Sequence, residues 1–337
     1  MAGRVWAANL DLVGSPFPAS FLDAMNATRP SVIAVVGPTA SGKSDLGIEL
    51  ALRLNGEIIN CDSVQVYQGI EIATAKVPLA ERRGIPHHLL DFVPPERNYT
   101  AQEWAQAAVA KIAEIEARGR VALLVGGTGF YLRALRQPFF ASPPTDEALR
   151  QRLAALRAKR GPEHLHRMLQ RLDAPAAARL FPRDWPRVQR ALEVFFQTKQ
   201  TLSAQAPQRP EPPECASRLR ILALNPPRAA LYERINRRAA QHFAAGLVAE
   251  VEGLLAQGVP AEANALGAHG YRRVVEYLRG ERSLASAIEQ TQLDVRHYAK
   301  RQFTWFRREP DVEWVAGFGE DHETQTAAYQ LLLEKIH

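Results

Sequence analysis

The residues that suggest chemistry begin at position 37, where the chain reads Gly-Pro-Thr-Ala-Ser-Gly-Lys-Ser. This octet fits the pattern GxxxxGK[ST] of a phosphate-binding loop, and it directly follows the apolar run 32–36. In such a loop, backbone N–H groups surround phosphate oxygens and the following helix directs its positive N-terminus at the same anion. We therefore predict that Lys43 reaches the outer phosphate and that the Ser44 hydroxyl binds Mg²⁺. The candidate phosphate-binding residues are Gly37, Pro38, Thr39, Ala40, Ser41, Gly42, Lys43 and Ser44.

The loop alone does not say which phosphate compound is bound, so the position of an acidic partner matters. Nucleotide-hydrolysing proteins of this class end a second strand in a carboxylate, but the run 121–125 ends in Gly-Gly-Thr-Gly. Asp62 instead follows the expected strand 57–61. Because the carboxyl ends of parallel strands face the ligand crevice, we expect Asp62 beside the phosphates, as a general base or an outer-shell metal partner. A structural aspartate that caps a turn with Ser63 is the alternative.

Composition indicates a soluble globular protein with room for two domains. The chain has 337 residues, of which 46% are hydrophobic and 23% charged. Its two cysteines, Cys61 and Cys215, lack the spacing of a disulfide framework or a zinc site, which favours a reducing, cytoplasmic location. No apolar run reaches the ~18–20 residues of a membrane span, and we expect no membrane partner. Residues 1–30 do not resemble a secretion signal, and we interpret them as a poorly ordered N-terminal extension.

The net charge of +6 and a sequence pI near 9.5 permit an anionic partner. Arginines crowd the stretch 150–190 and return in the run 296–308. At helical spacing, we predict that Arg296, Lys300 and Arg307 share a face that lies away from Phe303 and Phe306. Such a basic stripe suits a phosphate backbone, although a solvated helix surface is the alternative.

Apolar periodicity predicts an α/β fold. Strand-like runs at 32–36, 57–61, 121–125 and 219–224 alternate with helical patterns, which favours a P-loop NTPase-like core with a mainly parallel sheet flanked by helices. Leu46, Leu50 and Leu54 fall on one helical face. A capping box formed by residues 100 and 103 opens a helix that ends at residue 119 and has one apolar face: Trp104, Ala108, Ile112 and Ile115.

Between residues 141 and 215 the pattern changes to helices alone. We predict that Thr145 caps a helix whose Leu149, Leu153 and Leu156 face inward, followed by a second helix with inward Leu165, Met168, Leu169 and Leu172. Proline-rich stretches flank this block, which is typical of an all-helical insertion domain. We divide the chain into the extension 1–30, the first part of the core 31–140, the insertion 141–215, and a return to the core with basic C-terminal helices at 216–337.

Six spaced motifs lie at 37–44, 62–67, 72–76, 86–91, 125–131 and 300–306. Together they resemble those of tRNA dimethylallyltransferases, also called tRNA isopentenyltransferases, of the IPP transferase family. The resemblance runs from about residue 31 to 315 and implies transfer of a dimethylallyl group from its diphosphate to N6 of the adenosine just 3′ of the anticodon.

The residues suit this implied chemistry. Dimethylallyl diphosphate needs no adenine pocket, so the loop amides, Lys43 and Mg²⁺ can stabilise the departing diphosphate. Asp62 can accept a proton from the attacking amino group. By resemblance Arg238 also belongs near the diphosphate, with a structural salt bridge as the alternative. The candidate catalytic residues are Asp62, Lys43, Ser44 and Arg238.

The implied partners are dimethylallyl diphosphate and the anticodon arm of tRNA, whose target base must leave its stack to reach the site. We expect a monomer. We interpret Phe195 and Phe196 as core residues rather than a stacking platform. The tRNA contacts that the resemblance implies are Asp62, Ser63, Val64, Gln65, Thr128, Arg150, Arg187, Val188, Gln189, Arg190, Ala191, Gly267, Ala268, His269, Gly270, Tyr271 and Arg272.

A few positions depart from the family pattern or suggest another site. His269 stands where an apolar residue is expected, and Arg273 stands where an acidic residue is common. Ser44 replaces a frequent threonine but keeps the hydroxyl. His87 and His88 suggest a metal site, but adjacent side chains point in different directions on a strand or a helix, which disfavours it.

Two other classes of protein fit parts of the pattern. A small-molecule kinase would bind ATP in the same loop, and the helical insertion could serve as its lid. The bare strand end at 126–128 and the long basic chain after residue 228 argue against it. A nucleotide-gated RNA-binding protein would use the loop as a switch, and Asp62 would then have no role in turnover.

Overall fold

The computed structural model describes residues 32–140 and 143–334, so the predicted extension 1–30 lies outside the described residues. The chain divides into two compact units. The core unit comprises residues up to 98, 110–127 and from 218 onward, and the helical unit comprises residues 99–109 and 128–217.

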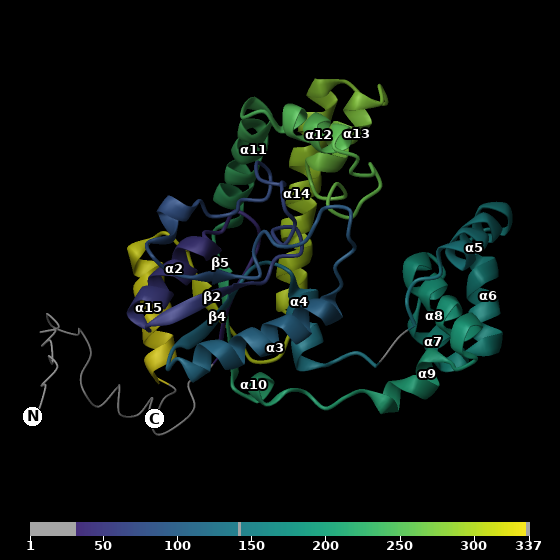
Figure 1. Cartoon of the computed structure of the whole chain (residues 1–337), viewed down its shortest axis with the longest axis horizontal. Coiled ribbons are helices and arrows are strands. Elements are labelled where there is room, and N and C mark those ends of the chain that lie inside the picture. Colours follow the sequence, from purple (N-terminus) through teal and green to yellow (C-terminus); the bar gives the residue numbers. More distant parts are fainter. Residues whose placement is uncertain (1–31, 141–142, 335–337) are drawn as a thin grey trace, which may run out of the picture. The chain divides into compact units, whose positions relative to one another are not determined.

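The core unit is built on one six-stranded sheet in the order β3-β2-β4-β1-β5-β6, with every neighbouring pair parallel (Figure 1). This confirms the predicted parallel sheet. The five residues of β1 and the five of β4 are all buried, because a strand covered on both faces needs side chains that are apolar throughout. The strands are β1 (Val32–Val36), β2 (Gly56–Asn60), β3 (His87–His88), β4 (Val121–Val125), β5 (Leu219–Asn225) and β6 (Val312–Ala316).

The four expected strands are therefore present, with bounds that differ by at most one residue. The sequence did not predict β3 and β6. β3 has only two residues, too few for a periodic signal, and β6 lies at the sheet edge with mostly half-buried side chains.

Helices cover the sheet and extend beyond it. Leu46 and Leu50 of α2 are fully buried and Leu54 nearly so, which confirms the predicted apolar face. Figure 1 shows α11, α12, α13 and α14 grouped together in the core unit. The helices of the core unit are α2 (Lys43–Arg53), η1 (Leu79–Arg82), α11 (Arg228–Ala244), α12 (Leu247–Ala256), α13 (Tyr271–Leu278), α14 (Leu284–Phe306) and α15 (His322–Glu334).

Helix α3 (Ala101–Ala117) begins as its capping box predicts. The Glu103 N–H donates to the Thr100 hydroxyl at 3.2 Å, and the Glu103 carboxylate accepts from the Thr100 N–H at 2.8 Å. The predicted apolar face is confirmed, since Trp104, Ala108, Ile112 and Ile115 are each at most 1% exposed.

The regular elements described between residues 143 and 215 are helices, and they share a core that includes Leu153, Leu165 and Leu169. The predicted cap at Thr145 is wrong. Asp146 caps the first of these helices by accepting from the Leu149 N–H at 2.9 Å, because a cap side chain reaches the third residue of the helix. The helices that follow α3 in the helical unit are α4 (Gly129–Arg136), α5 (Glu147–Arg160), α6 (Pro162–Leu172), α7 (Ala174–Arg179), α8 (Trp185–Thr198), α9 (Leu202–Gln205), η2 (Ala206–Gln208) and α10 (Glu214–Ser217).

The basic stripe on α14 is not placed as predicted. The guanidinium of Arg307 lies over the Phe303 ring, 5.7 Å from its centroid, and Arg296 donates to the Asn236 side chain. Residues seven or four positions apart lie on one helical face, so Arg296, Phe303 and Arg307 lie on the same face rather than on opposite faces.

Among the helices of the described ranges, none is long and apolar enough to cross a lipid bilayer.

A buried carboxylate on β2 ties three segments of the core unit together. Glu57, with a side chain 3% exposed, pairs with Arg118 at 2.7 Å, Arg120 at 3.2 Å and His88 at 2.6 Å. Burial raises the pKa of the Glu57 carboxyl, but hydrogen bonds from Arg118 and His88 outweigh burial and leave the pKa below its ordinary value.

We expect Glu57→Ala to lower the free energy of unfolding by about 1–3 kcal/mol at pH 7, because the two arginines lose their shared acceptor but are partly exposed. Since the pKa of Glu57 is lower in the folded state, its stabilisation is present above the ordinary glutamate pKa and is lost as pH falls through the folded value. Urea unfolding at pH 7 and at pH 4 would measure both effects. Glu114→Ala, which removes an exposed pair with Lys111, serves as the control and should leave the unfolding midpoint unchanged. An equal loss in both variants would contradict the role of Glu57.

Candidate active site

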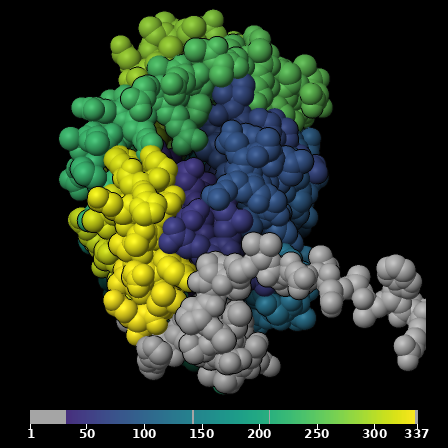
Figure 2. Space-filling model, turned by 90° about the vertical axis from the view of Figure 1, so that its left-hand side faces the viewer, coloured from purple at the N-terminus to yellow at the C-terminus, as the bar shows by residue number. Residues whose placement is uncertain are grey.

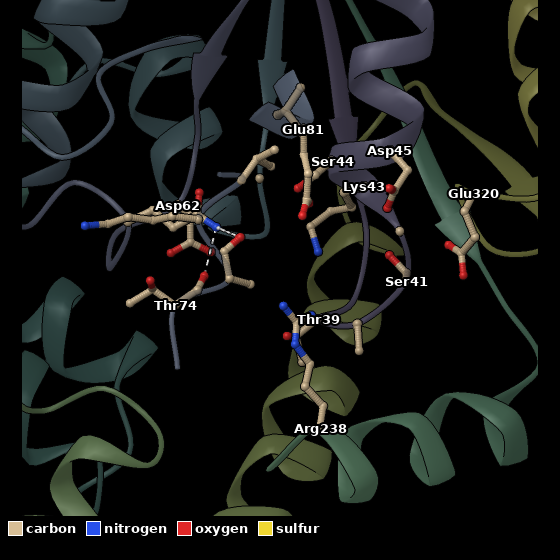
Figure 3. A pocket seen from close by; sticks show the side chains of 18 of the residues that line it. Thr39, Ser41, Lys43, Ser44, Asp45, Asp62, Thr74, Glu81, Arg238 and Glu320 are labelled. Atoms are coloured by element: carbon tan, nitrogen blue, oxygen red, sulfur yellow. Dashed lines mark hydrogen bonds between the residues drawn. The ribbon is translucent and has the colours of Figure 1, made fainter. Parts of the chain in front are cut away.

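A pocket of about 500 Å³ lies at the carboxyl edge of the parallel sheet (Figure 3). The phosphate loop follows β1, Asp62 follows β2, and Gly126 follows β4, so residues at three strand ends form part of the pocket's wall. This is where the rule for open parallel sheets places a ligand. Arg238 enters from α11.

The phosphate loop has a tight backbone that special conformations maintain. Gly42 precedes α2 in the left-handed region, with φ of 82°. Ala40 has φ of 63°, which is unusual for a residue with a Cβ, and it is buried among Leu231, Ile235 and Phe303. Packing around Ala40 therefore stabilises a loop shape that the local sequence alone disfavours.

Lys43 points into the space that Asp62 and Arg238 flank (Figure 3). Its ammonium donates to the Pro38 carbonyl oxygen at 2.7 Å. Burial lowers the pKa of Lys43 to about 8; nearby Asp62 opposes this change and Arg238 adds to it. Both groups are thus close enough to act on the lysine electrostatically.

Asp62 is fixed in place by a hydrogen-bonded turn. Its Oδ1 accepts from the Val64 N–H at 2.9 Å, and its own N–H donates to Asn60 Oδ1 at 3.1 Å. A Cβ on Gly126 would lie 2.1 Å from the Cys61 carbonyl oxygen, so the end of β4 must be glycine for this turn to form. Asp62 therefore has the structural role of the alternative interpretation and also lines the pocket.

Arg238 is a mostly buried cation whose charge is not balanced. Burial lowers its pKa, and the neighbouring Arg234 lowers it further, while Asp45 opposes both. Among the residues that the structure describes, no carboxylate forms a salt bridge with Arg238, so the predicted structural alternative is not found there. A buried cation without a partner favours the binding of an anion.

Gln302, on α14, holds the phosphate loop against the end of β4. Its Oε1 accepts from the Thr39 N–H at 2.7 Å, and its Nε2 donates to the Gly127 carbonyl oxygen at 2.9 Å. The side chain is buried. Gln302 lies in the motif 300–306, but the sequence did not predict its role. A polar residue between the apolar Ala299 and Phe303 on one helix was the signal that could have indicated a buried hydrogen-bonding side chain.

The candidate RNA-binding segment 267–272 is joined to the segment 72–76 in the core unit. The Tyr271 hydroxyl donates to the Glu250 carboxylate at 2.5 Å and accepts from the Ala73 N–H at 3.3 Å. His269 packs its ring 5.0 Å from that of Tyr298, and burial lowers its pKa, so a neutral imidazole occupies the place of an apolar residue. The departure at His269 therefore leaves a packed loop.

The remaining candidates in the core unit have varied environments. Gln65 donates its amide to the carbonyl oxygens of Thr74 and Ala75, at 2.9 and 3.2 Å. Arg272 is exposed and pairs with Glu276, whereas Arg273 pairs with both Glu276 and Asp294. The acidic residue common at position 273 is therefore replaced by a cation that has carboxylate partners.

Most candidates in the helical unit contact a buried carboxylate or lie in the core, and one arginine is exposed. Arg150, Gln189 and Arg190 converge on the carboxylate of Glu193, which is fully buried, with contacts of 3.0, 3.1 and 3.4 Å. Val188 and Ala191 belong to the core of this unit, and Thr128 occupies the N-cap position of α4. The side chain of Arg187 is 70% exposed. Phe196 packs against the same core, in agreement with its predicted place, and Phe195 lies edge-on to it.

The metal-binding capacity of the protein alone is small. Across residues 32–140 and 143–334, no group of three or more histidine, cysteine, aspartate or glutamate side chains could hold a metal ion. His88 contacts Glu57, and His87 contacts the Ile85 carbonyl oxygen. The pocket does contain the Ser44 hydroxyl and the Asp62 carboxylate, which are oxygen donors of the kind that Mg²⁺ prefers.

Comparison with known proteins identifies the family of this chain. Residues 65–309 match the family model described as IPP transferase. A tRNA dimethylallyltransferase from Solibacter usitatus is 47% identical over 297 residues, which cover 88% of this chain and 96% of the relative. The protein of that name from Geobacter metallireducens is 47% identical over 290 residues, covering 85% and 93%.

Two solved structures are similar along most of their length. The full-length tRNA isopentenylpyrophosphate transferase of Bacillus halodurans superposes with a TM-score of 0.67 at 36% identity, covering 91% of this chain and 97% of the other. A eukaryotic dimethylallyltransferase, described as acting on tRNA, gives a TM-score of 0.74 at 26% identity, covering 90% and 78%. With its phosphate loop, its pocket and these relatives, the chain belongs to the IPP transferase family.

Proposed function

We propose that this chain transfers a dimethylallyl group from dimethylallyl diphosphate to N6 of the adenosine next to the anticodon of tRNA, on its 3′ side. The observation that carries the proposal is a single pocket in which Lys43 and Arg238, which has no salt-bridge partner among the described residues, face the carboxylate of Asp62. The cationic end of this pocket can bind a diphosphate, and the carboxylate of Asp62 at the other end can accept a proton. The names of the relatives support tRNA as the acceptor.

At the donor end, Lys43, Arg238 and the loop amides bind the diphosphate. As the C–O bond of the allyl diphosphate breaks, the electron pair stays on the leaving oxygen and negative charge grows there. Fixed donors in a buried site stabilise this charge more strongly than water would. The allyl carbon becomes electron-poor and open to attack.

At the acceptor end, the amino nitrogen of the adenine attacks the allyl carbon. A new N–C bond forms, and the nitrogen must lose a proton. Asp62 Oδ1 is engaged by the Val64 N–H, and the carboxylate retains acceptor capacity for this proton. A positioned base of this kind contributes about 10²–10⁴ in rate. The adenine has to leave its stack to reach a recessed pocket.

Mg²⁺ fits this site as a partner of the bound diphosphate. The protein supplies the Ser44 hydroxyl, with the Asp62 carboxylate as an outer-shell partner, and Mg²⁺ commonly takes its other ligands from phosphate oxygens and water. When bound, the ion would neutralise charge on the leaving diphosphate. Ser44 would hold it.

We propose that the predicted insertion, residues 141–215, binds the anticodon arm, and that the segments 62–65 and 267–272 of the core unit also contact tRNA. Exposed Arg187 suits a phosphate contact, while the ion-pair network around Glu193 keeps Arg150 and Arg190 in fixed positions. The chemistry requires no second copy, so we propose a monomer. The two cysteines, Cys61 and Cys215, are buried, and we propose a cytoplasmic location for the protein.

Asp62→Asn should separate chemistry from binding, because asparagine can keep the turn to Val64 yet cannot accept the proton. We expect the single-turnover rate with saturating tRNA and donor to fall by about 10²–10⁴, while the affinities for both change less than threefold. Asp311→Asn, at an exposed position with φ of 61°, is the matched control and should react at the normal rate. A normal rate in Asp62→Asn would show that Asp62 is not the base.

The lowered pKa of Lys43 predicts how donor capture depends on pH. Protonated Lys43 binds the diphosphate, and its pKa near 8 means that the charge is lost as pH rises through that value. We expect kcat/KM for dimethylallyl diphosphate to fall about tenfold per pH unit above pH 8, since this ratio reports the free enzyme. In Lys43→Arg the charge persists, and the decline should disappear. A profile of the unsubstituted protein that stays flat to pH 9.5 would rule out the proposed role of this proton.

A further inference from the structure

The loop between β6 and α15, residues 317–321, contacts the phosphate loop, and its Glu320 lines the edge of the pocket. We call it the C-terminal loop; it lies beyond residue 309, where the match to the family model ends. The Gly319 N–H donates to the Ser41 carbonyl oxygen at 2.8 Å. A Cβ on Gly319 would lie 1.9 Å from the Gly42 carbonyl oxygen, so the two backbones are in direct contact.

Arg234 of α11 makes a second connection between the two loops. Its Nη1 donates to the Ala40 carbonyl oxygen at 3.3 Å, and its Nη2 pairs with the Glu320 carboxylate. The guanidinium also lies over the Phe318 ring, 4.5 Å from its centroid. Glu320 thus holds Arg234 where it can reach the phosphate loop.

The C-terminal loop has its own internal support. Phe318 and Asp321 exchange two hydrogen bonds, at 3.0 and 3.1 Å, and Gln325 donates to the Gly319 carbonyl oxygen at 3.0 Å. Figure 2 shows the C-terminal segment, in yellow, beside the start of the core unit, in purple. In Figure 3, Glu320 and Asp62 lie on opposite sides of the phosphate loop.

Because a peptide bond is planar, these contacts also fix the direction of the adjacent backbone N–H groups. In a trans peptide the C=O and the next N–H point in opposite directions. Because Arg234 holds the Ala40 carbonyl and Gly319 holds the Ser41 carbonyl, the Ser41 N–H points away from Arg234 and the Gly42 N–H points away from the C-terminal loop. Within the described chain, neither of these N–H groups donates to a protein acceptor. They are oriented for an anion.

We propose that the C-terminal loop is a backbone clamp that holds the N–H groups of Ser41 and Gly42 in their anion-binding orientation before the diphosphate arrives. Gly319 and Glu320 are its positioning residues. The clamp rests on the proposed function, since the diphosphate is the anion it serves. Holding the donors in advance removes the ordering cost that binding would otherwise carry, and it maintains the unusual conformation of Ala40.

The first test compares Gly319→Ala with Gly253→Ala in the full-length chain. Gly253 lies in α12 with open space around it, so the same chemical change should be harmless there. We expect the affinity for inorganic diphosphate, measured by calorimetry, to fall at least tenfold in Gly319→Ala and to change less than twofold in Gly253→Ala. A Gly319→Ala protein that melts normally and binds diphosphate normally would overturn the clamp.

The second test uses Glu320, where positioning and simple electrostatics predict opposite signs. Removal of a negative charge near an anion site should strengthen diphosphate binding by charge alone. The clamp instead predicts that Glu320→Ala weakens diphosphate binding three- to tenfold, while Glu320→Gln, which can still accept from Arg234, stays within twofold of the unsubstituted protein. Binding in Glu320→Ala that is unchanged or stronger, or an equal loss in both variants, would overturn the clamp.

Steady-state kinetic constants distinguish loss of the clamp from a general loss of folded protein. In Glu320→Ala we expect KM for dimethylallyl diphosphate to rise while KM for tRNA stays unchanged, a split that general destabilisation would not produce. Inorganic diphosphate also distinguishes the two proposals. If the unsubstituted protein does not bind it, the donor site itself is wrong; if it binds and the variants bind equally, only the clamp is wrong.

Discussion

The site depends on the buried amide of Gln302. This one side chain satisfies the Thr39 N–H and the Gly127 carbonyl oxygen, both at the carboxyl edge of the sheet, and it comes from a helix more than 170 residues further along the chain. A buried amide that lost either contact would leave polar groups unsatisfied, which costs about 1–3 kcal/mol each. The phosphate loop therefore has a fixed position relative to β4, and through Gly126 relative to Asp62. Lys43 and Asp62, which follow different strands, face the same pocket for this reason.

An imbalance of charge gives the pocket its preference for an anion. Lys43 and Arg238 are both partly buried, and burial lowers the pKa of each, so the folded protein bears a cost that a bound anion relieves. Asp62 offsets this cost only in part. The same carboxylate is held in place by a turn. The arrangement keeps a cationic end and a carboxylate end separate within one cavity.

Local signals in the sequence predicted the phosphate loop, four strands and the capping box at Thr100, because each depends on spacing within a few residues. Asp62 could be placed from the general geometry of parallel sheets, whereas Arg238 was assigned by resemblance alone. The contacts of Gln302 and Gly319 join residues that lie far apart in sequence, and no periodicity encodes them. The two-residue β3, the edge strand β6 and the cap at Asp146 were missed or displaced because their signals are short or ambiguous.

In the proposed reaction, the phosphate loop binds a diphosphate leaving group and the acceptor is a tRNA adenine. A single-turnover incubation of the full-length chain with unmodified tRNA, Mg²⁺ and dimethylallyl diphosphate tests it directly, with mass analysis of the nucleosides and assay of released diphosphate. We expect N6-dimethylallyl adenosine and inorganic diphosphate to form in equal amounts. Folded protein with competent tRNA that gives no prenylated nucleoside, but transfers phosphate from ATP, would contradict it.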